Sequence, residues 1–154
     1  NNEMDDFSAK PGMPNAYELV GSDANSIQPG KRPLSSMTPT IVLKNKKPFL
    51  VIGSPGGSTI ITTTMQVILN VVVFGMDIKE AVSSPRFHSQ WLPDVIMTEP
   101  RGLSKDVIKT LVSRGHTLTP YRWGYIGEAN GILIGKNGFY GGGDTRGETS
   151  SAGY

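Results

Sequence analysis

The chain has 154 residues, a length typical of one domain with a single hydrophobic core. Hydrophobic residues make up 37% and charged residues 18%, and the net charge of +2 comes from Lys and Arg spread along the chain, so a nucleic-acid surface is not indicated. The absence of Cys excludes disulfides and cysteine-ligated metal sites, and Thr, Gln, Asn and Gly interrupt the longest apolar stretch, which argues against a membrane span.

The first part of the chain is predicted to be extended and loop-rich. Residues 1–37 carry acids, Pro, Gly and Asn without a sustained hydrophobic period. Regular structure is expected to begin with a β-hairpin. Its two runs, residues 38–43 and 48–53, flank the polar turn residues 45–47.

An amphipathic helix is predicted next. Ser58 stands where a helix N-cap is expected, and Gly75 is expected to end the helix. Apolar residues recur between them at the spacing of one helix face. We expect that face to be buried, and it consists of Ile60, Ile61, Met65, Ile68, Leu69 and Val72.

The second half of the chain is predicted to mix short helices and strands. Two helices are expected, at residues 77–83 before Pro85 and from Ser104 to about Ser113 before Gly115. Strands are expected at residues 95–98, 116–119, 131–134 and 139–142, the last two forming a hairpin turned by residues 136–138. Hairpins favour antiparallel pairing, so we predict an α+β fold of one domain, residues 1–154, with antiparallel strands and helices packed on one face.

The segment SPGGST, residues 54–59, lies where the predicted strand passes into the helix. A phosphate-binding P-loop is not indicated, because no Lys stands at the required place after Gly53. A serine-hydrolase elbow would need Gly where Ile52 stands. Two interpretations stay open. The backbone N–H groups of Gly56 and Gly57 could form an oxyanion hole at the positive end of the helix, or the segment could be a tight structural turn.

Neither histidine is predicted to be a catalytic base. His88 and His116 have no convincing nucleophile near them in the sequence. We expect both to be ordinary surface or hydrogen-bonded, partly buried side chains.

Four sequence blocks lie in order across nearly the whole chain. They are NNEMDDFS at residues 1–8, KRPLSSMTPT at 31–40, GSPGGS at 53–58, and SPRFH with QWLP at 84–93. With these blocks the sequence resembles the γ-glutamyltranspeptidases, also called glutathione hydrolases, and their bacterial members in particular. The resemblance implies part of the αββα sandwich of the N-terminal nucleophile hydrolases. Residues 1–154 would be the C-terminal portion of the small, catalytic subunit.

The resemblance also implies an activity and a set of partners. Members of the family cut themselves into a large and a small subunit, and the new N-terminal Thr of the small subunit attacks glutathione or another γ-glutamyl amide. The γ-glutamyl-enzyme then passes its acyl group to water, an amino acid or a peptide. The implied partner is the large subunit, the implied location is periplasmic or secreted, and no cofactor, metal or nucleic acid is implied.

Substrate-binding positions carry over from the family by motif. Glu3 and Asp6 match the acids that bind the α-amino group of the substrate, and charge-assisted hydrogen bonds suit that role. Ser35 and Ser36 match the pair that hydrogen-bonds the α-carboxylate.

The resemblance assigns two further features. Gly56 and Gly57 match the backbone donors of the oxyanion hole, and this favours the catalytic interpretation of the turn. Residues 11–22 correspond to a loop that closes over the substrate in many bacterial members, with Tyr17 at its aromatic position.

The sequence departs from the family at three places. The segment with the nucleophilic Thr lies before the position of Asn1 in the family, so we expect this chain to be a fragment that is inactive alone. Thr59 stands where bacterial relatives commonly have Arg, and residues 143–146, GDTR, replace the usual Asp-Pro-Arg. Neither of these two changes is expected to touch the substrate-binding set.

Two alternative functions stay open. One is a β-lactam or glutaryl acylase of the same superfamily, against which the retention of Asp6 and Tyr17 argues. The other is a non-catalytic module that kept the fold and lost the nucleophile.

Overall fold

The computed structural model describes residues 4–152. Its α-helices are α1 (Ile60–Val72), α2 (Ile78–Ser83) and α3 (Lys105–Ser113). Its strands are β1 (Thr40–Lys44), β2 (Lys47–Gly53), β3 (Phe87–His88), β4 (Ile96–Thr98), β5 (Leu118–Pro120), β6 (Asn130–Gly135) and β7 (Gly138–Gly142). Three short 3-10 helices complete the elements: η1 (Met4–Asp6), η2 (Asp23–Asn25) and η3 (Gly57–Thr59).

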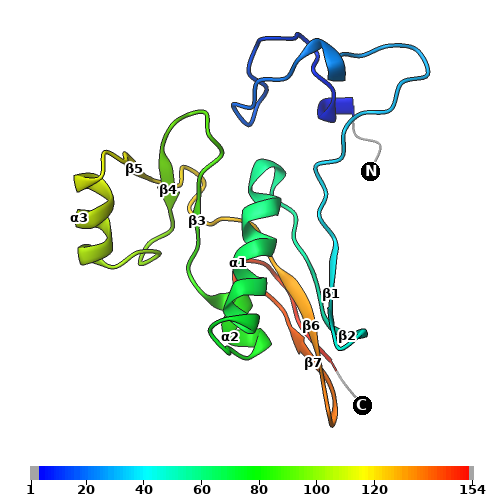
Figure 1. The fold of residues 1–154 in the computed structure, drawn as a ribbon, viewed down its shortest axis with the longest axis vertical. Helices are drawn as coiled ribbons and strands as arrows, with labels where there is room; N and C mark the ends of the chain where they lie inside the picture. The colour runs from blue at the N-terminus through cyan, green and yellow to red at the C-terminus, as the bar shows by residue number, and fades with distance from the viewer. Residues whose placement is uncertain (1–3, 153–154) are drawn as a thin grey trace.

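A four-stranded antiparallel sheet forms the centre of the fold. Its strand order is β1-β2-β6-β7, so the two predicted hairpins are confirmed and lie side by side (Figure 1). Asn45 and Lys46 both have positive φ angles, as the right-handed twist of a two-residue hairpin turn requires. The mixture of helices with antiparallel sheet confirms the predicted α+β class.

The hydrophobic core lies between one face of this sheet and helices α1 and α2. Leu50 and Ile52 alternate along β2 and are almost completely buried, which is the period-two pattern of a strand with one covered face. The helices pack Val67 of α1 and Val82 of α2 against them. Asp77 caps α2, because its side chain accepts a hydrogen bond of 2.8 Å from the N–H of Glu80.

The buried face of α1 differs from the predicted one. Of the six predicted residues, Ile60 is buried and Ile68 is partly buried, but the other four are exposed: Ile61, Met65, Leu69 and Val72. The inward face instead contains Thr63, Thr64 and Val67. Thr63 packs closely on Gly127, because a Cβ built on Gly127 would lie 2.5 Å from the Thr63 hydroxyl oxygen. Periodicity alone could not separate two apolar stripes on one helix.

The start of α1 also differs from the prediction. Residues 57–59 form the 3-10 helix η3, and the N-cap residue of α1 is Thr59, not Ser58. No side-chain hydrogen bond caps this end of the helix.

A smaller sheet, β3-β4-β5, lies beside the helices and carries α3 (Figure 1). The strands predicted at 95–98 and 116–119 correspond to β4 and β5, and the predicted third helix corresponds to α3. β4 and β5 are parallel, so the predicted antiparallel pairing is wrong for these two strands. They can be parallel because α3 connects them as a crossover. No helix of residues 4–152 is long and apolar enough to cross a bilayer.

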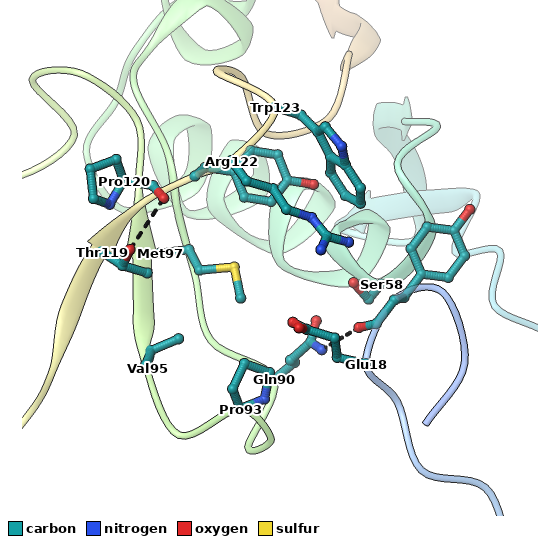
Figure 2. A pocket seen from close by; sticks show the side chains of 12 residues that line it. Glu18, Ser58, Gln90, Pro93, Val95, Met97, Thr119, Pro120, Arg122 and Trp123 are labelled. Atoms are coloured by element: carbon teal, nitrogen blue, oxygen red, sulfur yellow. Dashed lines mark hydrogen bonds between the residues drawn. The ribbon is translucent and has the colours of Figure 1, made fainter. Parts of the chain in front are cut away.

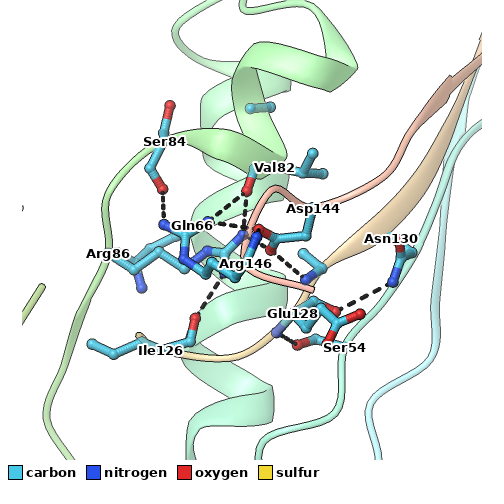
Figure 3. Close-up of polar contacts among 12 residues, drawn as sticks. Ser54, Gln66, Val82, Ser84, Arg86, Ile126, Glu128, Asn130, Asp144 and Arg146 are labelled. Atoms are coloured by element: carbon cyan, nitrogen blue, oxygen red, sulfur yellow. Dashed lines mark hydrogen bonds and ion pairs between the residues drawn. The ribbon is translucent and has the colours of Figure 1, made fainter. Parts of the chain in front are cut away.

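Three buried ion pairs join the two sheets. Arg86 and Arg146 both donate to Asp144 (Figure 3). Arg146 also donates to Glu99, and all four side chains are almost inaccessible to solvent. Two positive and two negative charges therefore balance within this cluster. The guanidinium groups also donate to main-chain carbonyls, including that of Ile126 at 2.7 Å, so the charges are both paired and hydrogen-bonded.

The two carboxylates fix the backbone that leads into β6. Glu99 accepts a hydrogen bond of 2.6 Å from the N–H of Ile126, and Asp144 accepts one of 2.7 Å from the N–H of Ala129. Burial by itself would raise the pKa of Asp144, but the hydrogen bonds from Arg86 and Arg146 outweigh burial and lower it. Asp144 is therefore an anion that stabilises the fold.

Replacing Asp144 by Asn should lower the free energy of unfolding by about 3–5 kcal/mol at neutral pH, since it leaves buried guanidinium charge uncompensated. The pKa of Asp144 in the folded state lies below its unfolded value of about 3.9. The stabilisation that the Asp144 carboxylate gives to the fold is therefore complete above that pH, and it is lost as the pH falls through the folded-state pKa. Urea unfolding at several pH values measures this, with the exposed Asp94→Asn as control. A deficit that does not shrink below about pH 4 would contradict the prediction.

Candidate active site

The SPGGST segment forms a sharp corner between β2 and α1. Gly56 has a φ of 141° and Gly57 a φ of 55°, both in the region that favours glycine. A Cβ on Gly56 would lie 2.5 Å from the Thr59 hydroxyl oxygen and 3.3 Å from the Cα of Gly127. Both backbone angle and available space therefore require glycine at position 56.

The corner is held by hydrogen bonds to its carbonyl groups and hydroxyls. Thr59 donates from both its N–H and its hydroxyl to the carbonyl of Gly56, at 3.0 and 2.9 Å. Ser54 accepts a hydrogen bond of 3.0 Å from the N–H of Glu128. Thr59 is buried beneath the turn and contacts Gly56 directly.

The N–H groups of this corner are uncapped. Among residues 4–152, none of the hydrogen bonds is donated by the N–H of Gly56 or of Gly57. Unshielded amides at the start of a helix attract negative charge, since the helix dipole adds to their own. The turn has the properties that an oxyanion hole needs.

A cavity of about 910 Å³ opens beside the corner. Its lining brings together the predicted positions from four separate stretches of sequence: Asp6, Tyr17, Ser35, Ser36, Gly56 and Gly57. Glu3 lies outside the described residues. The remaining predicted positions thus share one cavity, although up to 51 residues separate them along the chain.

Asp6 presents an unsatisfied acceptor. Its Oδ2 atom is buried and has no hydrogen-bond partner among the described residues. A buried acceptor without a partner is costly unless a ligand supplies the donor. An ammonium group in the cavity would supply it.

Asn25 links the acid to the serine pair, and sequence analysis missed it. Its side-chain amide donates to the carbonyl of Asp6 at 2.6 Å, and its side-chain oxygen accepts from the N–H of Leu34 at 3.0 Å. Asn25 thereby ties the backbone of the acidic segment to the residue before Ser35. No local pattern marks this residue, because both partners come from other parts of the loop.

The lid segment predicted at residues 11–22 forms a small closed loop. Gly12 donates to the carbonyl of Gly21 at 2.9 Å, and Pro14 and Val20 form an antiparallel bridge. The ring of Tyr17 packs on the glycine corner, since a Cβ built on Gly57 would lie 2.4 Å from the ring. The aromatic side chain therefore lies directly against the uncapped amides.

A second, smaller cavity of about 220 Å³ lies behind the lid (Figure 2). Tyr17 and Gln90 contribute to it, and so does the aromatic pair Tyr121 and Trp123, whose rings meet edge to face at 5.5 Å. Burial raises the pKa of Tyr121, which keeps its hydroxyl protonated. Within the described part of the chain, no three His, Asp or Glu side chains gather as metal ligands.

A sequence profile described as Gamma-glutamyltranspeptidase matches residues 1–154. The chain belongs to this family. It is 50% identical to a glutathione hydrolase proenzyme of Escherichia coli over 100% of the chain and 26% of the relative, and 47% identical to one of a Pseudomonas species over 99% of the chain and 28% of the relative. The chain thus spans about a quarter of the length of these curated relatives.

Solved structures of the family share the fold. The chain is similar to the T380A mutant of Helicobacter pylori γ-glutamyltranspeptidase, with 56% identity, a TM-score of 0.88, and coverage of 96% of this chain and 80% of the other. It is also similar to the Pseudomonas nitroreducens enzyme complexed with L-DON, with 42% identity, a TM-score of 0.89, and coverage of 100% and 80%. A cephalosporin acylase of Bacillus halodurans is more distant, with 27% identity and a TM-score of 0.73 over 84% of this chain and 25% of the acylase.

Substituting Ala at Gly57 should displace the Tyr17 ring and loosen the lid. The matched control is Gly75→Ala, because Gly75 has a similar φ of 70° but no atom within 4 Å of an added Cβ. Both variants should lose about 1–2 kcal/mol from the left-handed backbone. Only Gly57→Ala should accelerate chymotrypsin cleavage after Tyr17, and equal cleavage rates in the two variants would refute the packing argument.

Proposed function

We propose that this chain is the C-terminal portion of the small subunit of a γ-glutamyltranspeptidase, and that residues 1–154 form one domain of it. The full-length protein would hydrolyse glutathione and other γ-glutamyl amides and transfer their γ-glutamyl group to amino acids or peptides. The observation that carries the proposal is the single cavity in which Asp6, with its unpartnered oxygen, faces the same space as Ser35, Ser36 and the uncapped glycine amides.

In this proposal the cavity holds the glutamyl group by its two ends. The ammonium group donates to the carboxylates of Asp6 and Glu3, and the α-carboxylate accepts hydrogen bonds from Ser35 and Ser36. When both the ammonium group and the α-carboxylate are held, the side chain of the substrate can extend from the α-carbon in only one direction. The γ-carbonyl oxygen then reaches the N–H groups of Gly56 and Gly57.

The reaction proceeds through a tetrahedral intermediate. The hydroxyl oxygen of the N-terminal Thr of the small subunit bonds to the carbon of the γ-carbonyl group, its proton passes to the α-amine of that Thr, and the carbonyl electron pair moves onto oxygen. Gly56 and Gly57 stabilise this oxyanion, and one such donor is worth about 3–4 kcal/mol of activation free energy. The intermediate collapses to the acyl-enzyme as the leaving amine takes the proton. Water or an acceptor amine then attacks the ester carbon, the bond from that carbon to the Thr oxygen breaks, and the proton of the attacking group returns to the Thr hydroxyl through the α-amine.

The large subunit is the proposed partner. The outward side of α1 exposes Ile61 at 59% and Met65 at 46%, and the uncovered face of the sheet exposes Ile41, Val51 and Ile132. The three strand residues are register partners, so they form one continuous apolar stripe. Contiguous exposed apolar surface of this kind marks a protein interface. The rest of a proenzyme four times as long supplies the surface to cover it.

The proposed location is the bacterial periplasm or the extracellular medium. Its support is the similarity to bacterial glutathione hydrolases. The proposed maturation is self-cleavage of a precursor, in line with the term proenzyme in the names of those relatives.

Replacing Asp6 by Asn in the full-length protein should raise KM for a chromogenic γ-glutamyl anilide about 10-fold to 100-fold. The reason is the loss of a hydrogen bond to a charged group, worth about 1.5–3 kcal/mol. The control variant is Asp23→Asn, which removes the same charge from an exposed position outside the cavity.

The matched substrate control is a glutaryl anilide, which lacks the α-amino group. Asp6→Asn should leave the rate with this compound nearly unchanged. Faster turnover of the glutaryl than of the γ-glutamyl compound by the unsubstituted protein would favour a glutaryl acylase instead. Equal effects of Asp6→Asn on both substrates would refute the role of Asp6 in binding the ammonium group.

The isolated chain should not turn over the same γ-glutamyl anilide. In this proposal the Thr that combines nucleophile and base lies in another segment of the small subunit, and residues 1–154 supply the binding residues and the oxyanion donors. Absorbance at the anilide wavelength measures this, with the full-length protein as the positive control. Sustained turnover by residues 1–154 alone would overturn the assignment of the nucleophile to the preceding segment.

A further inference from the structure

Two side chains from distant parts of the chain hold the tip of the lid. Gln90 donates from Nε2 to the carbonyl of Tyr17 at 2.7 Å (Figure 2). Arg122 donates from Nη2 to the carbonyl of Ala16 at 3.1 Å. The two donors lie 73 and 106 residues beyond the carbonyls that they contact. The lid is therefore docked on the second half of the chain at two consecutive carbonyls.

The orientation of Gln90 is imposed by its surroundings. Its Nε2 also donates to the carbonyl of Leu92 at 3.0 Å, so both N–H bonds point at carbonyl oxygens. The Oε1 atom must then face Nε2 of His88, which lies 2.8 Å away. Because an amide oxygen only accepts, this ring nitrogen carries a proton.

His88 in turn is fixed to the first turn of α1. It is buried at 2% exposure, and its Nδ1 lies 2.8 Å from the hydroxyl oxygen of Thr62. Thr62 follows the glycine corner by five residues. A continuous series of hydrogen bonds thus runs from the start of α1 through His88 and Gln90 to the backbone of Tyr17.

Arg122 is held in place as well. Its guanidinium group stacks on the ring of Trp123 at 4.0 Å from the ring centre. Stacking reduces the freedom of a long, exposed side chain and lowers the entropic cost of its hydrogen bond to Ala16. The lid tip is therefore clamped by one buried series of hydrogen bonds and one surface contact.

We propose that Gln90, oriented by His88, and Arg122 are positioning residues that keep Tyr17 against Gly57 and so hold the lid closed over the cavity. The catalytic consequence rests on the proposed function. Loss of either clamp shifts the lid toward open conformations, so the substrate leaves more easily. The glycine corner keeps the hydrogen bonds to the carbonyl of Gly56, the acidic segment keeps its own, and the chemical step is unaffected.

The test uses the full-length protein with the substitutions Gln90→Leu and Gln90→Glu. Leu removes all three hydrogen bonds of the side chain, whereas Glu keeps an acceptor for His88 and places a carboxylate oxygen against the carbonyl of Tyr17. Gln28→Leu, at an exposed position away from the lid tip, is the control. Arg122→Leu is the second test, and since Arg122 is exposed this variant folds even if the Gln90 variants do not.

Two measurements are made on each variant. Deuterium exchange of residues 12–21 should accelerate about 3-fold to 10-fold in the Gln90 and Arg122 variants, the range expected for one hydrogen bond, and stay unchanged in Gln28→Leu. KM for the γ-glutamyl anilide should rise by a similar factor, with kcat within about twofold of the unsubstituted protein.

Unchanged exchange in both Gln90→Leu and Arg122→Leu would overturn the proposal. A fall in kcat at constant KM would also overturn it, because that result places Gln90 in the chemical step. The exchange measurement needs no activity. If the full-length protein fails to cleave γ-glutamyl amides, the proposed function fails while the clamp is still tested.

Discussion

Two buried carboxylates organise this structure. Glu99 and Asp144 neutralise two buried arginines and at the same time accept the N–H groups of Ile126 and Ala129. Because charge balance and backbone hydrogen bonding are satisfied together, residues 126–129 have one available position. That position brings Gly127 against the glycine corner, where a Cβ built on Gly56 would lie 3.3 Å from the Cα of Gly127. The shape of the glycine corner thus depends on charges that lie outside it.

The cavity depends on a different kind of interaction. Residues 4–37 contain little regular structure, and single side chains join their loops to one another and to the rest of the chain. Asn25 connects the acidic segment with the serine segment. Gln90 and Arg122 donate hydrogen bonds to the backbone of the loop at residues 11–22. Such contacts are individually worth about 1 kcal/mol, so they permit movement of the lid without disturbing the core. The glycine corner and the loop of residues 11–22 are therefore held by separate sets of contacts.

Sequence patterns predicted helices and strands correctly where each pattern was compatible with only one kind of structure. Both hairpins, the Asp77-capped helix and the helix after Ser104 lie close to their expected positions, because turn and capping chemistry is local. The predicted buried face of α1 was wrong. Ile61, Met65 and Leu69 are exposed, although they are as apolar as the residues that face the core. Thr63 packs closely on Gly127, and that contact joins residues 64 positions apart.

The sequence by itself determined the elements, the α+β class and, through four motif blocks, the family. It also determined the backbone conformation at Gly56 and Gly57, since no other residue adopts those backbone angles at low cost. Only the tertiary structure decided that one oxygen of Asp6 has no partner among residues 4–152, that Asn25 joins two loops, and that Gln90 links His88 to the backbone of Tyr17. The physical reason is that hydrogen bonds between distant segments leave no periodicity in the chain. Their donors and acceptors become partners only when the sheet and helices have brought them within about 3 Å.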